Sequence, residues 1–270
     1  SRLALMASAS GYWQDLTTND IERCDRDATV VILPVGATEQ HGPHLPLSTD
    51  SLIARAIAAE ALRHGSDAVT LLVLPPLDIG HSLEHRNSAG TLTLDADIVL
   101  GTWRAIGASV GSAGFRRLVI LNAHGGQRSI VDLAAVYLRA EQGLSVARAN
   151  YFSFGMPDGL FAADEVRLGI HGGEVETSLL LHIAPELVRR EHLQNFAYRD
   201  PARADNAVLG YEKPVGLGWL GEDLSAHGVV GNAANADAQR GERYLAFLGA
   251  QLVSVCEELR QVQLPDSSAR

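Results

Sequence analysis

Short apolar runs rich in β-branched residues alternate along the chain with segments in which apolar residues recur every three or four positions. The runs are typical of strands buried on both faces of a parallel sheet, and the periodic segments indicate amphipathic helices. This alternation predicts an α/β fold with a mainly parallel β-sheet flanked by helices. The predicted strands are 29–35, 69–74, 118–121 and 145–150, and the predicted helices are 51–63, 95–112, 127–141 and 236 to about 261.

The rest of the chain is less regular. A short apolar helix is expected at 179–183, whereas between 195 and 235 the periodicity weakens and Gly, Pro and Asn accumulate. Such a composition indicates short elements joined by loops. Because no repeat or low-complexity linker interrupts the chain, we expect one domain over residues 1–265, followed by a loose C-terminal tail at 266–270.

Composition narrows the class of protein. The 270 residues are 46% hydrophobic, which is enough for one large core, and the net charge is -10 with no basic cluster longer than two residues. Nucleic-acid binding is therefore not expected. No apolar run reaches about 18 residues and no signal-peptide pattern opens the chain, so we expect no membrane contact and a cytoplasmic location. Cys24 and Cys256 are expected to be reduced and structural.

Four residues that can bind metal follow the first predicted strand: Glu39, His41, His44 and Asp50. In an extended chain alternate side chains point the same way, so Glu39 and His41 can face one site, and a loop containing prolines can turn Asp50 back toward them. Mixed carboxylate and imidazole ligands suit Zn²⁺, Mn²⁺ or Fe²⁺. The alternative is that Glu39 and His41 are solvated and that Asp50 caps the next helix.

Two glycine-containing turns add further imidazoles. His124 precedes Gly125 and Gly126 at the carboxyl end of a predicted strand, the edge at which open α/β sheets bind ligands. An ordinary strand-to-helix turn with an incidental histidine is the alternative. His171, in a His-Gly-Gly turn, is suited to proton transfer near neutral pH.

Two carboxylates follow this second turn. Glu174 and Glu176 precede the short apolar helix, so either could bind metal, or both could stabilise the positive end of that helix.

A loop at 80–91 and a glycine-rich segment supply candidate substrate contacts. His81, Ser82 and His85 could line a pocket, since their loop follows the strand at 69–74. Trp219, which follows Gly216 and Gly218, could form a pocket wall. A solvated loop is the alternative for the first group, and simple packing is the alternative for Trp219.

These motifs resemble the creatininase (creatinine amidohydrolase) family. The likeness runs in order from residue 30 to 185, and the 80–91 loop and Gly228-Val229-Val230-Gly231 extend it over most of the chain. The resemblance implies a single creatininase-like α/β domain, a small-molecule substrate, two divalent metal ions per subunit (Zn, Mn or Fe) and a homohexamer. The residues that carry it are the run at 34–44, Thr49-Asp50, Asn122-Ala123-His124-Gly125-Gly126, His171-Gly172-Gly173 and Glu176-Thr177-Ser178.

The resemblance also implies the metal ligands. Glu39, Asp50 and His124 would hold one ion, and His41 with Asp50 would hold the second, so that Asp50 bridges. In creatininase the last carboxylate comes two residues after the metal-binding histidine, where this chain has Gly126.

We therefore expect Glu176 to be the fifth ligand. Glu174 is the alternative ligand and, with His171, a candidate catalytic residue.

The implied reaction is attack of metal-activated water on the carbonyl of a small cyclic amide or formamide, with His171 protonating the leaving nitrogen or stabilising the oxyanion. Creatininase has an aromatic residue where this chain has Gly125, so we expect Gly125, Ser82, His85 and Trp219 to shape a different substrate pocket. A peptidase of the mycofactocin-maturation type is an alternative. A non-catalytic, metal-bound partner in a biosynthetic complex is another.

Overall fold

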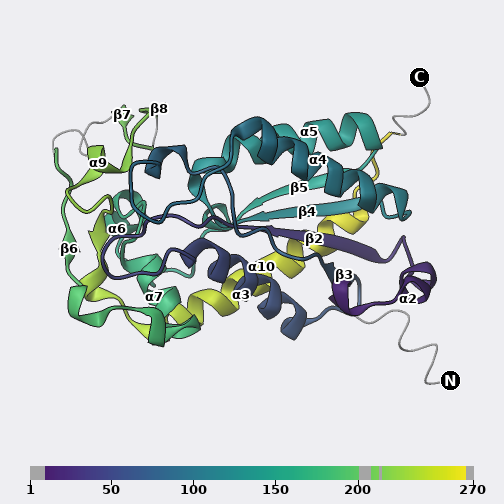
Figure 1. Cartoon of the computed structure of the whole chain (residues 1–270). Coiled ribbons are helices and arrows are strands. Elements are labelled where there is room, and N and C mark those ends of the chain that lie inside the picture. Colours follow the sequence, from purple (N-terminus) through teal and green to yellow (C-terminus); the bar gives the residue numbers. More distant parts are fainter. Residues whose placement is uncertain (1–9, 201–207, 213–214, 266–270) are drawn as a thin grey trace.

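A five-stranded sheet runs through the middle of the molecule, and each pair of neighbouring strands is parallel (Figure 1). The computed structural model describes residues 10–200, 208–212 and 215–265. Across the sheet the strand order is β1-β3-β2-β4-β5. The strands are β1 (Gly11–Tyr12), β2 (Thr29–Val35), β3 (Thr70–Val73), β4 (Arg117–Asn122) and β5 (Ser145–Asn150).

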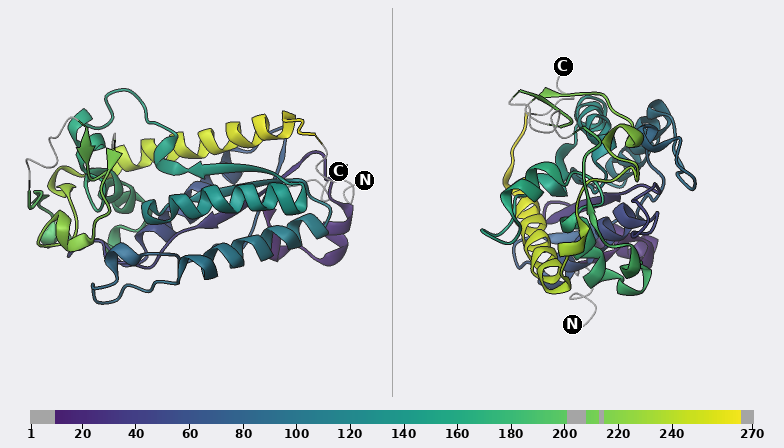
Figure 2. Two further views of the ribbon diagram at one scale, coloured as in Figure 1. Left: turned by 90° about the horizontal axis from the view of Figure 1, so that it is seen from above. Right: turned by 90° about the vertical axis from the view of Figure 1, so that its left-hand side faces the viewer.

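Helices cover both faces of the sheet. On one face lie α3 (Thr49–His64), α7 (Glu174–Ile183) and α10 (Ala238–Gln261), and on the other lie α4 (Ala96–Ser112) and α5 (Arg128–Gln142). Figure 2 shows that the axes of α4 and α5 lie lengthwise along the strands of the sheet. No helix in the described part of the chain is long and apolar enough to span a bilayer.

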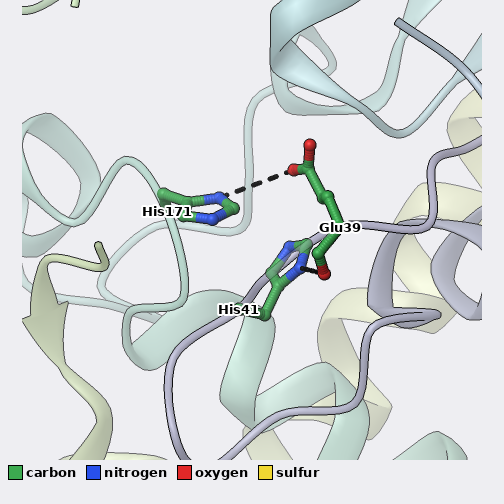
Figure 3. Close-up of side chains that lie close together, drawn as sticks. All are labelled: Glu39, His41 and His171. Atoms are coloured by element: carbon green, nitrogen blue, oxygen red, sulfur yellow. Dashed lines mark hydrogen bonds and ion pairs between the residues drawn. The ribbon is translucent and has the colours of Figure 1, made fainter. Parts of the chain in front are cut away.

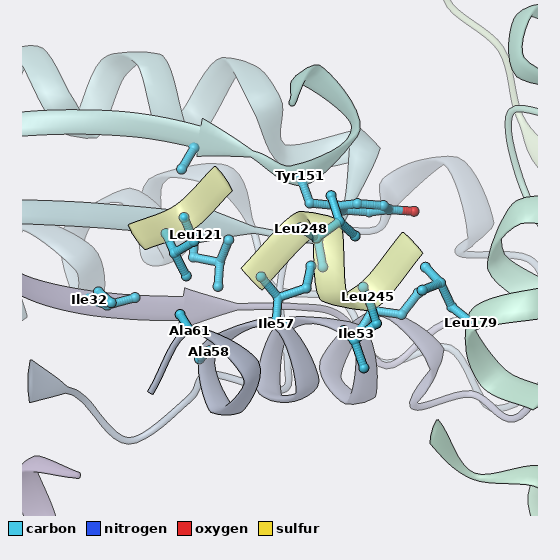
Figure 4. Close-up of a cluster of buried hydrophobic side chains, with 14 of the residues drawn as sticks. Ile32, Ile53, Ile57, Ala58, Ala61, Leu121, Tyr151, Leu179, Leu245 and Leu248 are labelled. Atoms are coloured by element: carbon cyan, nitrogen blue, oxygen red, sulfur yellow. The ribbon is translucent and has the colours of Figure 1, made fainter. Parts of the chain in front are cut away.

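The core reflects the unbroken apolar character of the central strand. All seven residues of β2 are buried, as expected for a strand with helices on both faces. On one face Ile32 and Leu121 pack against Ile57 of α3 and Leu248 of α10 (Figure 4). On the other face Leu33 and Ile120 belong to a second cluster with residues of α4 and α5.

The strand order places a switch point at the middle of the sheet. From β2 the chain crosses through α3 to β3 on one side, and then through α4 to β4 on the other side of β2. After β2 the chain continues into α3 on one face of the sheet, and after β4 it continues into α5 on the other face. This divergence leaves room beyond the carboxyl ends of β2 and β4, where ligands bind in such folds.

Short elements gather at that edge, on the left of Figure 1. β6 (Asn195–Phe196) pairs with β9 (Gly231–Asn232), and β7 (Leu209–Gly210) pairs with β8 (Val215–Gly216). α6 (Ala163–Leu168) and α9 (Gly221–Leu224) complete the edge. The remaining elements of the described chain are α2 (Thr18–Arg23) and the 3-10 helices Trp13–Asp15, Leu83–His85, Gly125–Gln127, Tyr151–Ser153, Pro185–Leu187, Arg190–His192 and Ala233–Asn235.

The predicted fold class, a mainly parallel sheet flanked by helices in one domain, is confirmed. The strands expected at 29–35 and 145–150 have those bounds, and the other predicted long elements differ by one or two residues at their ends. β1 and α2 were not predicted, because two residues are too few to show a strand pattern and α2 is only one and a half turns long. α7 begins at Glu174 rather than at residue 179, and the predicted tail at 266–270 lies outside the described residues.

Candidate metal and active site

The candidate ligands come from the two strand ends at the switch point and from the start of α3. Glu39 and His41 follow β2, His124 follows β4, and Asp50 lies in the first turn of α3. A Cβ on Gly36 would lie 2.7 Å from the Cα of Ser51, so only glycine lets α3 begin this close to β2. That close approach brings Asp50 to the two segments, and Glu39, His41, Asp50 and His124 are all buried.

Asp50 faces two imidazoles with its two carboxylate oxygens. Oδ2 lies 3.3 Å from Nδ1 of His124, and Oδ1 lies 3.2 Å from Nε2 of His41. Nδ1 of His124 is also 3.2 Å from Oε1 of Glu39. One carboxylate thus stands between the Glu39–His124 pair and His41, which is the arrangement of a bridging ligand.

Glu176 completes the second group. Ligand atoms of His41, Asp50 and Glu176 lie within 4.8 Å of one another. The backbone N–H of Gly172 donates to Oε2 of Glu176 at 2.6 Å, which fixes the carboxylate beside the His-Gly-Gly turn.

Glu174 is held elsewhere. Its carboxylate pairs with Arg240 of α10 and accepts a hydrogen bond of 3.0 Å from Asn235. It belongs to none of the three potential metal-binding groups found among the described residues. The two glutamates are two positions apart on a helix, where side chains point in different directions, so Glu176 reaches the site and Glu174 ties α7 to α10.

The side chain of His124 is oriented by hydrogen bonds behind it. Its Nε2–H donates to the carbonyl oxygen of His81 at 2.8 Å, so Nδ1 is the nitrogen that faces the carboxylates of Glu39 and Asp50. The amide of Asn122 holds the turn at both ends, accepting from the N–H of His124 at 3.0 Å and donating to its carbonyl at 2.8 Å. Such outer hydrogen bonds fix the tautomer and the ring orientation of metal-binding histidines.

His171 presents an unprotonated nitrogen to the centre. Its Nε2–H donates to the backbone carbonyl of Gln40 at 2.9 Å, and its Nδ1 lies 4.0 Å from Oε1 of Glu39 (Figure 3). The ring lies between His41 and His85, with centroids 4.3 Å from each. Gly172, at φ +65°, allows the tight turn that places it there.

The predicted substrate residues divide into two groups. Ser82 is fully buried with its Oγ 3.4 Å from Nε2 of His124, so it supports His124 rather than lining an open pocket. His85 belongs to the centre itself, since its Nε2 lies 3.8 Å from Oε1 of Glu39. Trp219 contacts the His85 ring edge-on at 5.9 Å, and Gly125 is exposed with no atom within 4 Å of where a Cβ would stand. Trp219 and Gly125 therefore remain candidates for the rim.

Two residues of the site were missed by the sequence-based selection. Glu84 and Gln40 lie inside quoted motifs, but nothing in the sequence singled them out. Ligand atoms of Glu39, Glu84 and His124 lie within 4.8 Å of one another. The side-chain N–H groups of Gln40 donate to Nδ1 of His85 at 3.0 Å and to the carbonyl of Gly228 at 2.8 Å, which joins three distant segments.

The buried carboxylates and imidazoles of the site shift one another's pKa values. Burial alone would lower the pKa of His41, but the carboxylate of Asp50 raises it to about 10. Burial alone would raise the pKa of Glu39, but the imidazole of His124 holds it well below its usual range. Burial raises the pKa of Glu176 to about 7. The carboxylates therefore attract positive charge, and a cation that binds here must displace protons.

A metal ion fits this donor set. Six buried side-chain nitrogen and oxygen atoms in the described chain lack a hydrogen-bond partner, and three of them are Oε2 of Glu39, Nε2 of His41 and Oδ2 of Asp50. Buried polar atoms are normally satisfied, so three unsatisfied ones in a single cluster indicate that these atoms are suited to bind a ligand. Carboxylate oxygens and imidazole nitrogens suit Zn²⁺, Mn²⁺ and Fe²⁺.

Fold and site together define the class: an α/β protein with a buried carboxylate and imidazole centre of the kind found in metal-dependent hydrolases. The creatininase family model, described as creatinine amidohydrolase, matches residues 14–256. The chain belongs to the creatininase family, and it is a hydrolase of that family.

The chain is also similar to named hydrolases. The mycofactocin precursor peptide peptidase of Mycobacterium ulcerans (strain Agy99) is 33% identical over 230 residues, covering 83% of both chains. The creatinine amidohydrolase of Pseudomonas putida is 31% identical over 202 residues, covering 67% of this chain and 75% of that one.

Solved structures agree with this fold. A putative creatinine amidohydrolase from Bacteroides fragilis NCTC 9343 has a TM-score of 0.76 at 28% identity, covering 95% of this chain and 98% of that one. A structure named creatininase Mn has a TM-score of 0.74 at 25% identity, covering 94% of this chain and 100% of that one.

Proposed function

We propose that this protein is a dinuclear metal-dependent hydrolase that cleaves an amide C–N bond. The observation that carries the proposal is Asp50, whose two oxygens face His124 and His41 separately. In this assignment Glu39, Asp50 and His124 hold one ion, and His41, Asp50 and Glu176 hold the other. When bound, two divalent ions supply Lewis acidity that activates water and polarises the scissile carbonyl.

The chain itself supplies proton transfer. Nδ1 of His171 has no proton, because Nε2 donates to the carbonyl of Gln40. A water held between Glu39 and His171 can therefore pass a proton to Nδ1 as it attacks, and the same atom can return the proton to the leaving nitrogen. Gln40 keeps the ring in this orientation. A non-catalytic, metal-bound partner would not require such a group, which argues against that alternative.

A short peptide is the substrate we favour. Apart from Gly125 and its two chain neighbours, no atom of the described residues lies within 4 Å of a Cβ built on Gly125, so the rim beside His124 is open where creatininase carries an aromatic residue. The peptide peptidase of M. ulcerans is also matched over a larger share of this chain than the P. putida amidohydrolase. A small cyclic amide or formamide, the first expectation from the sequence, becomes the second candidate, favoured by the enclosed ligands below the rim.

The test compares substrates on metal-loaded protein. Release of amine would be followed for a panel of short peptides, creatinine-like cyclic amides and formamides, with Asp50→Asn as the matched inactive control. We expect turnover of at least one peptide by the wild type and none by the variant. Turnover of cyclic amides alone would transfer the assignment to the second candidate. Equal rates for wild type and Asp50→Asn would refute the bridging role.

Three finer expectations belong to this proposal. The metals are expected to be Zn, Mn or Fe, which elemental analysis of protein purified without added metal would identify. A homohexamer is expected, and light scattering of the purified protein would test it. A cytoplasmic location is expected, and cell fractionation would test it.

A further inference from the structure

Glu84 occupies space that is free only because residue 126 is glycine. A Cβ on Gly126 would stand 1.6 Å from Oε1 of Glu84 and 2.8 Å from Nε2 of His124. Glu84 belongs to the 3-10 helix Leu83–His85 and precedes His124 by 40 residues in the sequence. The structure thus brings a carboxylate from another element to a position beside His124 that a side chain on residue 126 would otherwise take.

The carboxylate of Glu84 lies among the metal-site groups and has few contacts of its own. Oε1 is 3.6 Å from Nε2 of His124, too far for a hydrogen bond. Its side chain is only 13% exposed, and its partners are the imidazole of His124 and its own backbone N–H. Ligand atoms of Glu39, Glu84 and His124 lie within 4.8 Å of one another, so a cation held by Glu39 and His124 would also face this carboxylate.

We propose that Glu84 is an additional carboxylate of the metal centre, acting on the ion held by Glu39 and His124. This inference rests on the proposed dinuclear site. Two divalent ions carry four positive charges, whereas Glu39, Asp50 and Glu176 carry three negative charges. Glu84 supplies the fourth, so the centre is neutral once both ions are bound.

The geometry makes a carboxylate at position 84 and a side chain at position 126 mutually exclusive. A glutamate at 126 would meet Oε1 of Glu84, whereas in a Glu84→Ala background that contact is removed and the close contact that remains is the one of 2.8 Å to Nε2 of His124. Gly125 offers a matched control, because a Cβ there meets nothing within 4 Å and the residue is exposed. A carboxylate placed at 125 is one residue away but is not directed into the same space.

The experiment measures metal, not turnover. Zn²⁺ affinity and bound Zn²⁺ per subunit would be determined by competition with a chromophoric chelator for wild type, Glu84→Ala, Glu84→Ala/Gly126→Glu and Glu84→Ala/Gly125→Glu. We expect Glu84→Ala to weaken one of two sites by about 10- to 100-fold, as for other groups that support metal ligands. The double variant with Gly126→Glu should regain most of that affinity, and the one with Gly125→Glu should not.

Each outcome separates this inference from the proposed function. Two tight sites in wild type with unchanged affinity in Glu84→Ala would overturn the role of Glu84 and leave the dinuclear site intact. Equal recovery of Zn²⁺ affinity in Glu84→Ala/Gly125→Glu and Glu84→Ala/Gly126→Glu would also overturn it, because the position of the carboxylate would then not matter. Fewer than two sites in wild type would refute the dinuclear proposal itself. Circular dichroism of the metal-free variants would confirm that each one folds.

Discussion

At the scale of the residue, the proton-transfer role proposed for His171 can be tested directly. Its Nε2–H donates to the carbonyl of Gln40, and its Nδ1 faces Glu39 without a proton. We expect His171→Ala to lower kcat by roughly 100- to 10,000-fold, the usual contribution of a positioned acid or base. Metal content should stay near two ions per subunit, measured by elemental analysis beside the steady-state kinetics.

Glutamine at position 171 is a useful comparison, because it can keep the hydrogen bond to Gln40 but cannot carry a proton. Unchanged turnover in His171→Ala would refute the proton-transfer role of His171. Loss of both ions in His171→Ala would show instead that His171 is a metal ligand, a possibility raised by its closeness to Glu39 and His41.

His44 should make stability sensitive to pH. Its Nε2–H donates to the carbonyl of Gly172 at 2.9 Å, while its Nδ1 is buried without a partner. Burial lowers the pKa of His44 from 6.5 to about 4. In the unfolded chain His44 therefore binds a proton below about pH 6.5, whereas in the native protein it does so only below about pH 4. The free energy of unfolding falls as the pH drops through this window, by about 2 kcal/mol at pH 5.

The measurement is urea unfolding of metal-free protein at pH 7 and pH 5, compared with His44→Gln. Glutamine can keep the donor to Gly172 and does not titrate, so the variant should lose about 2 kcal/mol less than wild type between the two pH values. Parallel losses in both proteins would show that His44 does not resist protonation. Histidines that do not interact with His44 contribute equally to both proteins and cancel in the difference.

At the scale of the element, the contact between α10 and α7 depends on a glycine. A Cβ on Gly241 would stand 1.9 Å from the carbonyl oxygen of Ser178, and backbone cannot move aside as a flexible side chain can. We expect Gly241→Ala to destabilise the protein by about 1–3 kcal/mol, the usual cost of overpacking. Chemical denaturation of purified protein would measure it.

Gly101 of α4 is the matched control, because it is also inside a helix but has no atom within 4 Å of its Cβ position. Gly101→Ala should stabilise the protein by about 0.5–1 kcal/mol, since alanine favours helix more than glycine does. If both substitutions changed stability in the same direction, the close approach of α10 to α7 would not be what requires glycine at 241.

At the scale of the whole molecule, the metal centre joins β2, α3, β4 and α7, so metal removal should weaken the fold as a unit. Each ion that binds only the native state stabilises it by about 2.7 kcal/mol at a free concentration 100 times Kd. For a chain of this size that corresponds to a fall in Tm of about 5–10 °C on chelation for each ion removed. Differential scanning calorimetry with and without chelator would measure it.

Asp50→Asn should lose most of this difference, because it removes the carboxylate that both ions share. A wild-type Tm that is identical with and without chelator would contradict a structural contribution from metal. A difference that persists in Asp50→Asn would show that the ions are held without the bridge.

How far the sequence alone could predict the molecule follows from which interactions are local. The run at 29–35 is apolar apart from Thr29, and only a strand covered on both faces can bury it. The bounds of this strand and the α/β fold class of the protein therefore followed directly from the sequence. The candidate ligands Glu39, His41 and Asp50 followed from their density beside that strand, and His124 from its place at the end of another. The choice of Glu176 rested on family resemblance and remains a prediction, now supported by its closeness to His41 and Asp50.

Tertiary structure decided the rest, because the deciding contacts join residues far apart in the chain. Glu174 and Glu176 look equivalent in sequence, but Arg240 of α10 holds the first while the second reaches His41 and Asp50. Nothing in the sequence distinguished Glu84 from the other residues of its loop, and only the packing shows that it lies in the space left by Gly126. Sequence therefore determined the sheet, its helices and the chemical type of the site. Only the packing of distant segments determined which carboxylate stands beside which imidazole.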